Sequence, residues 1–130
     1  MEMGHDMAEK ILVIDDTPVI RELLKEFFGD AGSEVDTAVN GREGYDMAIA
    51  EDYDLIICDV HMPEMNGFEM VVNLRQTKPE SKIIIMDSLP GKDAKKATDA
   101  GAIVCLAKPF DLDELRKLVK EIRITKTSTI

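Results

Sequence analysis

Three aspartates and one lysine directly follow short apolar runs, at positions where their charged groups could act together. Asp15 and Asp16 follow one run, Asp59 follows another, and Lys108 comes shortly after a third. Carboxylate oxygens with little nitrogen or sulfur nearby suit Mg²⁺ or Mn²⁺ rather than Zn²⁺. Mg²⁺ takes only one or two carboxylates, so one acid would remain free to react, opposite a compact lysine charge. These residues predict a hard-cation site beside a reactive carboxylate.

Five β-rich apolar runs alternate with five amphipathic stretches along the chain. The expected strands cover residues 11–14, 35–39, 54–58, 82–86 and 103–106, and the expected helices cover about 18–31, 42–50, 68–76, 93–100 and 111–122. Thr17 is expected to cap the first helix, with Pro18 at its first position. This alternation predicts a parallel sheet with helices on both faces. In such sheets the ligand site lies beyond the carboxyl ends of the strands, where the charged residues collect.

Length and composition predict one soluble domain with one core. The chain has 130 residues, of which 45% are hydrophobic, and its formal net charge is −10. The negative charge argues against direct binding to nucleic acid or anionic membranes. No apolar run approaches the roughly 20 residues of a membrane span, so we expect no membrane insertion and a cytoplasmic location. We expect an extension over 1–9, the domain over 10–123 and a tail over 124–130, with Cys58 and Cys105 as buried reduced thiols.

Four motifs together carry a family resemblance. They are Ile-Leu-Val-Ile-Asp-Asp at 11–16, Asp-Val-His-Met-Pro-Glu-Met-Asn-Gly at 59–67, Ala-Gly-Ala at 100–102 and Lys-Pro-Phe at 108–110. In this order and spacing, the sequence resembles the receiver domain of two-component response regulators, similar to the single-domain chemotaxis and sporulation receivers. The resemblance implies an α/β fold, a flavodoxin-like (βα)5 doubly wound sheet of five parallel strands in the order 2-1-3-4-5.

The resemblance also implies a role for each residue of the charged cluster. Asp59 would accept a phosphoryl group from a histidine kinase, a phosphotransfer protein or a small phosphodonor. Asp15, Asp16, the Asp59 carboxylate and the backbone carbonyl of His61 would hold Mg²⁺, with Mn²⁺ as the alternative. Lys108 would pair with a phosphoryl oxygen. The modified domain would then bind a downstream target protein, and no enzymatic activity is expected beyond self-phosphorylation and autodephosphorylation.

Two positions depart from the family pattern. Receivers place Thr or Ser at the end of the fourth strand, where counting from the apolar run gives Asp87, with Ser88 next to it. The distance onward to Lys108 is one residue shorter than usual, so either Ser88 supplies the hydroxyl or an acid replaces it. Cys105 stands three residues before Lys108, where the family usually has Tyr or Phe, which puts the coupling of phosphorylation to the surface in doubt.

Three functions compete on the sequence alone. A phosphorylation-gated interaction module is favoured by the intact Asp15, Asp16, Asp59 and Lys108. A phosphorylation-independent docking domain would keep the fold but have a disabled switch. A hydrolase would need a further acid-base group and a substrate pocket, for which the sequence offers no evident candidates. His61 is expected to be exposed in the loop after Asp59, where it could also tune the lifetime of the phosphoryl group.

Overall fold

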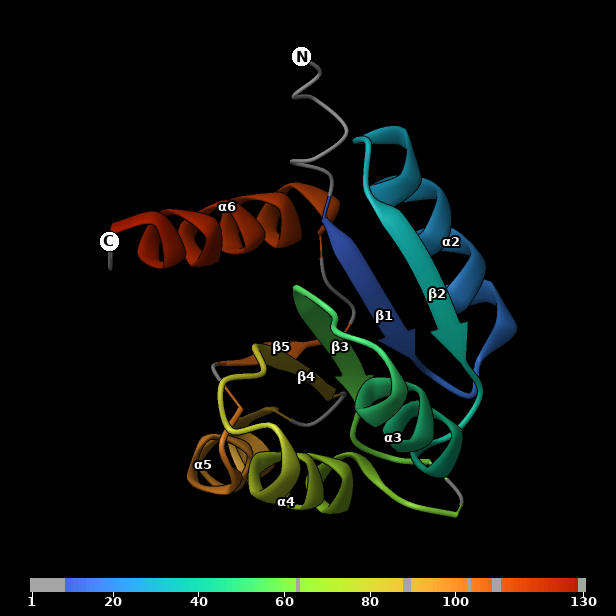
Figure 1. Ribbon diagram of the computed structural model, residues 1–130, viewed down its shortest axis with the longest axis vertical. Helices are drawn as coiled ribbons and strands as arrows, with labels where there is room; N and C mark the ends of the chain where they lie inside the picture. The colour runs from blue at the N-terminus through green and yellow to red at the C-terminus, as the bar shows by residue number, and fades with distance from the viewer. Residues whose placement is uncertain (1–8, 63, 88–89, 103, 109–110, 129–130) are drawn as a thin grey trace.

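Strands and helices alternate along the whole described chain (Figure 1). The computed structural model describes residues 9–62, 64–87, 90–102, 104–108 and 111–128. Its elements in chain order are β1 (Lys10–Ile14), α2 (Pro18–Asp30), β2 (Glu34–Ala38), α3 (Gly41–Ala50), β3 (Leu55–Asp59), α4 (Gly67–Thr77), β4 (Ile83–Asp87), α5 (Pro90–Ala100), β5 (Val104–Ala107) and α6 (Leu112–Ser128). The alternation predicted from the sequence is therefore confirmed.

The five strands form one parallel sheet in the order β2-β1-β3-β4-β5, which confirms the predicted topology. Ile14 at the end of β1 pairs with Ala38 of β2 on one side and with Cys58 of β3 on the other. The chain runs outward from β1 in both directions, so the strand order reverses beside β1. The carboxyl ends of β1 and β3 are thus neighbours, as a ligand site at a switch point requires.

The sheet is covered on both faces, and alternate strand residues enter two separate cores. Leu12, Ile14, Ile56 and Cys58 are among the buried residues of the core with α3, α4 and α5. The other core contains the residues of opposite parity together with buried side chains of α2 and α6. Figure 1 shows these two groups of helices on opposite sides of the sheet. Strands buried on both faces explain why β1, β3 and β4 are continuous apolar runs.

Three helix ends differ in detail from the sequence predictions. Thr17 occupies the N-cap position of α2, but its side chain makes no capping hydrogen bond. Helix α5 begins at Pro90, earlier than expected, and a proline is well tolerated at the first helical position. Helix α6 continues to Ser128 rather than ending near Ile122. Strong apolar periodicity locates a helix better than it locates the ends, because terminal residues gain little from packing.

A single arginine fastens the end of α4 to the turn after α5. Arg75 donates to the backbone carbonyl of Gly101 through Nε, at 2.9 Å, and to that of Pro79 through Nη1, at 2.7 Å. Gly101 has a φ of +121°, and a Cβ there would lie 2.7 Å from Arg75 Nε. Only glycine therefore combines this backbone conformation with the close approach of the arginine.

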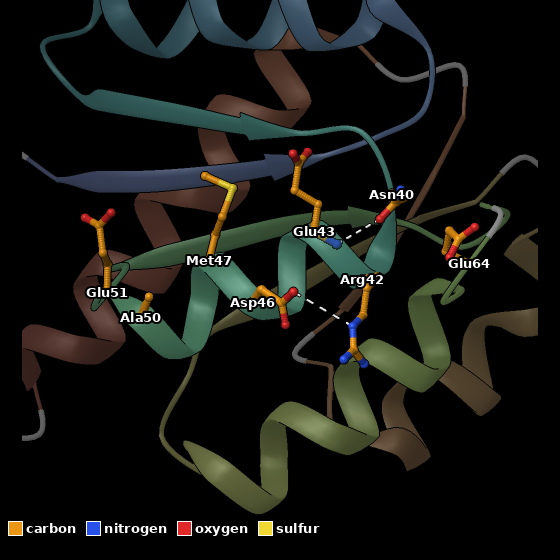
Figure 2. Close-up of a pocket in the computed structure, with 8 residues that line it drawn as sticks. All are labelled: Asn40, Arg42, Glu43, Asp46, Met47, Ala50, Glu51 and Glu64. Carbon is orange, nitrogen blue, oxygen red and sulfur yellow. Dashed lines mark hydrogen bonds and ion pairs between the residues drawn. The ribbon is translucent and has the colours of Figure 1, made fainter.

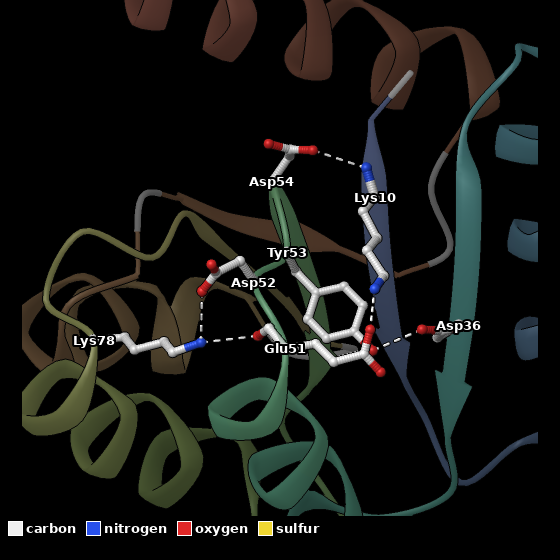
Figure 3. Close-up of polar contacts among 7 residues, drawn as sticks. All are labelled: Lys10, Asp36, Glu51, Asp52, Tyr53, Asp54 and Lys78. Carbon is white, nitrogen blue, oxygen red and sulfur yellow. Dashed lines mark hydrogen bonds and ion pairs between the residues drawn. The ribbon is translucent and has the colours of Figure 1, made fainter. Parts of the chain in front are cut away.

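Polar contacts close the opposite end of the sheet from the aspartate cluster (Figure 3). The Tyr53 hydroxyl donates to Asp36 Oδ2 at 2.7 Å, and Lys10 contacts Glu51 while lying 5.3 Å from the centroid of the Tyr53 ring. Burial raises the pKa of Tyr53, and the hydrogen bond to Asp36 raises it further. Lys78 donates to the Glu51 carbonyl at 2.8 Å. These contacts join β1, β2 and the segment that enters β3.

We predict that Tyr53→Phe lowers the free energy of unfolding by about 1–2 kcal/mol, because a partly buried carboxylate loses a hydrogen-bond donor. Urea denaturation would measure the loss. Tyr45→Phe is the matched control, since the Tyr45 hydroxyl makes an exposed contact with Thr77 at 3.0 Å. Equal effects of the two substitutions would show that the Tyr53–Asp36 bond adds no special stability.

Candidate functional site

The ends of β1 and β3 bring three carboxylates together. Asp15 and Asp16 follow β1, and Asp59 is the last residue of β3. One oxygen from each of the three lies within 4.8 Å of the others. Asp15 is fully buried and Asp59 is 6% exposed, whereas Asp16 faces solvent. The structure therefore assembles the acidic cluster that the sequence predicted.

Lys108 supplies the positive charge of the cluster. Its Nζ lies 3.0 Å from Asp15 Oδ2 and 3.2 Å from Asp59 Oδ1. Its backbone N–H donates to the Asp87 carbonyl at 2.8 Å, which continues the pairing of β5 with β4 beyond Ala107. The regular sheet thus delivers the lysine to two aspartates that are far away in the sequence.

Burial and like charge dominate the electrostatics of Asp59. Burial raises the pKa of this carboxyl, and the neighbouring charge of Asp15 raises it further, although Lys108 opposes both effects. Burial alone would lower the pKa of Lys108, but the hydrogen bond to Asp15 and the charge of Asp59 outweigh it and raise that pKa. The lysine is therefore held protonated between two acids whose repulsion it only partly offsets.

Asp15 is held firmly by contacts that the sequence analysis did not anticipate. Its Oδ1 accepts from the Thr17 backbone N–H at 2.8 Å, which leaves Oδ2 for Lys108. Its own carbonyl accepts from Arg21 Nη1 at 2.8 Å. An aspartate whose side chain accepts from the backbone N–H two residues later forms a common type of turn, and aspartate is a recognised turn residue in a sequence. The contact of Arg21 with the Asp15 carbonyl has no comparable sequence pattern.

The loop after Asp59 is tied back against the sheet. Val60 N–H donates to the Met86 carbonyl at 3.0 Å, and Gly67 N–H donates to the Val60 carbonyl at 2.9 Å. A Cβ on Gly67 would lie 2.5 Å from the backbone oxygen of Asp59, so a larger residue would displace the acid. Asn66 and Glu69 form a capping box at the start of α4. Pro63, part of the motif at 59–67, lies outside the described residues.

Asp87 ends β4 with a fully buried side chain, and its Oδ1 lies 3.3 Å from Nε2 of His61. His61 is exposed, as expected, with 61% of its side chain accessible. Ser88, the alternative source of a hydroxyl, lies outside the described residues. Cys58 is a buried free thiol whose pKa is raised by burial, whereas Cys105 is a free thiol that is only partly buried. The prediction of two buried thiols is therefore right for Cys58 and wrong in degree for Cys105.

Figure 2 shows a hollow beside α3 whose lining residues do not belong to this cluster. Its lining residues are Asn40, Arg42, Glu43, Asp46, Met47, Ala50, Glu51 and Glu64. Several of them serve the helix itself, since Asn40 Oδ1 accepts from Glu43 N–H at 2.8 Å and caps α3. None of the three clustered aspartates contributes to this lining. The chemistry is therefore assigned to the carboxylates and not to the hollow.

The donor chemistry of the cluster fits a hard divalent cation. All three acidic side chains offer oxygen, and the partner cation Lys108 is a compact ammonium. Mg²⁺ binds through one or two carboxylates and keeps several waters, so an exposed acid beside a buried one suits it. Asp15, Asp16 and Asp59 would hold the ion.

Comparison with known proteins decides the family. The profile of the response regulator receiver domain matches residues 11–120. The chain is a response regulator receiver domain. It is 36% identical over 116 residues to sporulation initiation phosphotransferase F of Bacillus subtilis, covering 88% of this chain and 94% of that protein. It is also 36% identical over 116 residues to the transcriptional regulatory protein CrdR of Helicobacter pylori, with 88% of this chain covered. Because the receiver domain spans only 54% of CrdR, it corresponds to about half of that regulator.

Solved structures agree with this assignment. The receiver domain matches the chemotaxis response regulator CheY4 of Vibrio cholerae with a TM-score of 0.83 and 34% identity, covering 89% of this chain and 99% of that one. It matches TrrA of Thermotoga maritima, solved in complex with Mg²⁺ and beryllofluoride, with a TM-score of 0.80 and 38% identity, covering 88% and 98%. Receiver domains act in two-component signalling and are generally not enzymes in their own right. In the described part of the chain, no helix is both long and apolar enough to cross a bilayer.

We predict that Asp59→Asn raises the melting temperature at pH 7 without Mg²⁺ by a few degrees. The raised pKa means that the fold disfavours the charged carboxylate, so the cost is present above the folded pKa and disappears as the pH falls toward the unfolded value. The difference between variant and wild type should therefore shrink toward pH 4, as followed by thermal denaturation. Asp46→Asn, at an exposed site on α3, serves as the control and should change little. A less stable Asp59→Asn protein at pH 7 would show that the Lys108 contact outweighs the repulsion.

Proposed function

We propose that this receiver domain accepts a phosphoryl group on Asp59 in a Mg²⁺-dependent reaction and then changes its contacts with other proteins. The observation that carries the proposal is Lys108 Nζ within 3.2 Å of Asp59 and 3.0 Å of Asp15, beside a cluster of three carboxylates. This arrangement would give an acidic nucleophile, a cation site and a fixed ammonium in one crevice. The Mg²⁺ complex of the related TrrA supports the choice of cation, and Mn²⁺ is expected to substitute for it.

The chemistry follows from the positions of the residues. A carboxylate oxygen of Asp59 attacks phosphorus, a new O–P bond forms, and the bond to the leaving group breaks with its electron pair. A bound Mg²⁺ supplies neutralisation of the charge on the transferring group. Asp15 orients the ammonium of Lys108, which then pairs with a phosphoryl oxygen. The donor is a histidine kinase, a phosphotransfer protein or a small phosphodonor.

Phosphorylation supplies the signal because it changes the charge balance of the crevice. The acyl phosphate adds roughly −1.5 to −2 charge and new acceptor oxygens, which must find donors. Lys108 is continuous with β5, so its change of partner acts directly on that strand. The output is a changed surface for a downstream protein. With a net charge of −10, direct binding of the domain to nucleic acid is disfavoured.

The docking-domain alternative rests on two residues, Asp87 and Cys105, that depart from the usual switch pattern. It requires that the cluster of Asp15, Asp59 and Lys108 has no role in function. The close mutual contacts of these three residues and the kinship with receivers solved as Mg²⁺ complexes do not favour it. A hydrolase is not supported either, because Asp15, Asp16 and Asp59 are not among the residues that line the hollow beside α3.

Incubation with acetyl phosphate and Mg²⁺ tests the proposal. We expect an adduct of one phosphoryl group on the wild-type protein and none on Asp59→Asn, as measured by intact-protein mass. Asp46→Asn is the control and should be modified like the wild type. An adduct of equal size on Asp59→Asn would place the acceptor elsewhere, and no adduct on the wild type would favour the docking domain.

Lys108→Ala should separate modification from response. The variant is expected to accept the phosphoryl group but to lose the change in amide hydrogen exchange of β5 and α6 that the wild type shows on modification. Lys95→Ala is the matched control, because Lys95 makes only an exposed contact with Asp99 on its own helix. A full exchange response from phosphorylated Lys108→Ala would exclude this lysine as the link.

A further inference from the structure

The contact between Asp87 and His61 joins two segments that flank the aspartate cluster. Asp87 Oδ1 lies 3.3 Å from His61 Nε2, and the Asp87 side chain is fully buried while 61% of the His61 side chain is exposed. A buried carboxylate is costly unless a nearby donor or cation offsets its charge. His61 provides such a group, and its exposure leaves room for the ring to move.

Backbone hydrogen bonds hold both residues close to Asp59. The N–H of Val60, between Asp59 and His61, donates to the Met86 carbonyl at 3.0 Å, directly before Asp87. The Asp87 carbonyl in turn accepts from Lys108 N–H at 2.8 Å. Backbone hydrogen bonds therefore connect the start of the loop after Asp59, the end of β4 and Lys108.

Asp87 creates a problem that His61 is placed to solve. An ionised carboxylate has no hydrogen to donate, so an ionised Asp87 would repel a phosphoryl group on the adjacent strand end. The phosphoryl oxygens need donors, and charge-assisted hydrogen bonds are the strong ones. Nε2 of His61 lies 3.3 Å from Oδ1 of Asp87, an acid that would compete with the phosphoryl group for a donor on the ring.

We propose that His61 and Asp87 replace the hydroxyl switch in this domain. His61 is the phosphoryl-contacting donor, and Asp87 is the positioning residue that holds the imidazole ring until Asp59 is modified. On modification, Nε2 of His61 moves from the Asp87 carboxylate to a phosphoryl oxygen, to which its N–H donates. No covalent bond changes and the proton stays on Nε2. The inference deepens the proposed function and rests on it.

The exchange also explains how a carboxylate could transmit a signal. Once His61 contacts the phosphoryl group, the Asp87 charge loses that contact while buried next to a new anion. The end of β4 is then driven to move, because both desolvation and repulsion act on the same side chain. Asp87 thus makes the segment that follows β4 responsive to phosphorylation.

A double-mutant cycle at these two positions tests the exchange. The measured quantity is the dissociation constant of beryllofluoride, a phosphoryl mimic, in the presence of Mg²⁺, for wild type, His61→Ala, Asp87→Asn and the double variant. We expect His61→Ala to bind beryllofluoride about tenfold more weakly, as for the loss of one hydrogen bond to a charged group. Asp87→Asn should bind more tightly, because the competing acceptor loses its charge.

The sign of the coupling between the two substitutions decides between exchange and a fixed pair. If His61 is released to the phosphoryl mimic, Asp87→Asn tightens binding more when His61 is present than when it is alanine. If His61 only neutralises Asp87, the same substitution tightens binding more in the His61→Ala background. Additive effects, or this second sign, would overturn the proposal.

Two further measurements keep the test independent of folding and of the proposed function. The ring resonances of His61 in NMR spectra should shift when beryllofluoride and Mg²⁺ are added, and Asp87→Thr should reproduce the tighter binding if Asp87→Asn does not fold. His5→Ala, which lies before the domain, is the control for the histidine signals. Binding to the wild type with an unmoved His61 ring would reject this inference alone, whereas no binding to the wild type would reject the proposed function as well.

Discussion

The repulsion between the carboxylates of Asp15 and Asp59 is the constraint on which the rest of the site depends. Both side chains are almost completely buried, and Lys108 reaches both of them. The lysine offsets this repulsion only in part, since the pKa of Asp59 is still raised. Because the negative charge of the crevice is not fully offset, the crevice attracts a cation. A further anion on Asp59 would increase the repulsion again. The proposed binding of metal and the proposed sensitivity to phosphorylation thus share one physical cause.

The strand order of the sheet brings the charged residues of the site together. Placing β1 beside β3 brings the two acids together, and the extension of β5 past Ala107 brings the lysine to them. Rigid strands buried on both faces prevent the acids from moving apart to relieve their repulsion. Gly67 completes the arrangement, because its missing side chain lets α4 begin directly against the backbone of Asp59.

The sequence pattern predicted the parallel sheet and the charged cluster well, because both have few alternatives, whereas the strand order was predicted from the resemblance to receiver domains. Apolar runs covered on both faces define a parallel sheet, and acids at strand ends must then meet at one edge. The contact of Asp87 with His61 could not be predicted, since it depends on how a loop folds back across a strand end. The hydrogen bond from Arg21 to Asp15 and the full length of α6 were not predicted either. The reach of a long side chain and the ends of helices are only weakly determined by sequence patterns.

Arg75 has a mechanical consequence beyond the stability of its own turn. The Arg75 guanidinium donates hydrogen bonds to the carbonyl of Gly101, after α5, and to that of Pro79, after α4. It therefore links the ends of the two helices. Helices joined in this way cannot easily slide past each other. A displacement that starts at the end of β4 and reaches α5 would also move α4. A partner protein in contact with either helix would then meet the same change. Under the proposed function, one phosphorylation event would therefore change the surface at both helices.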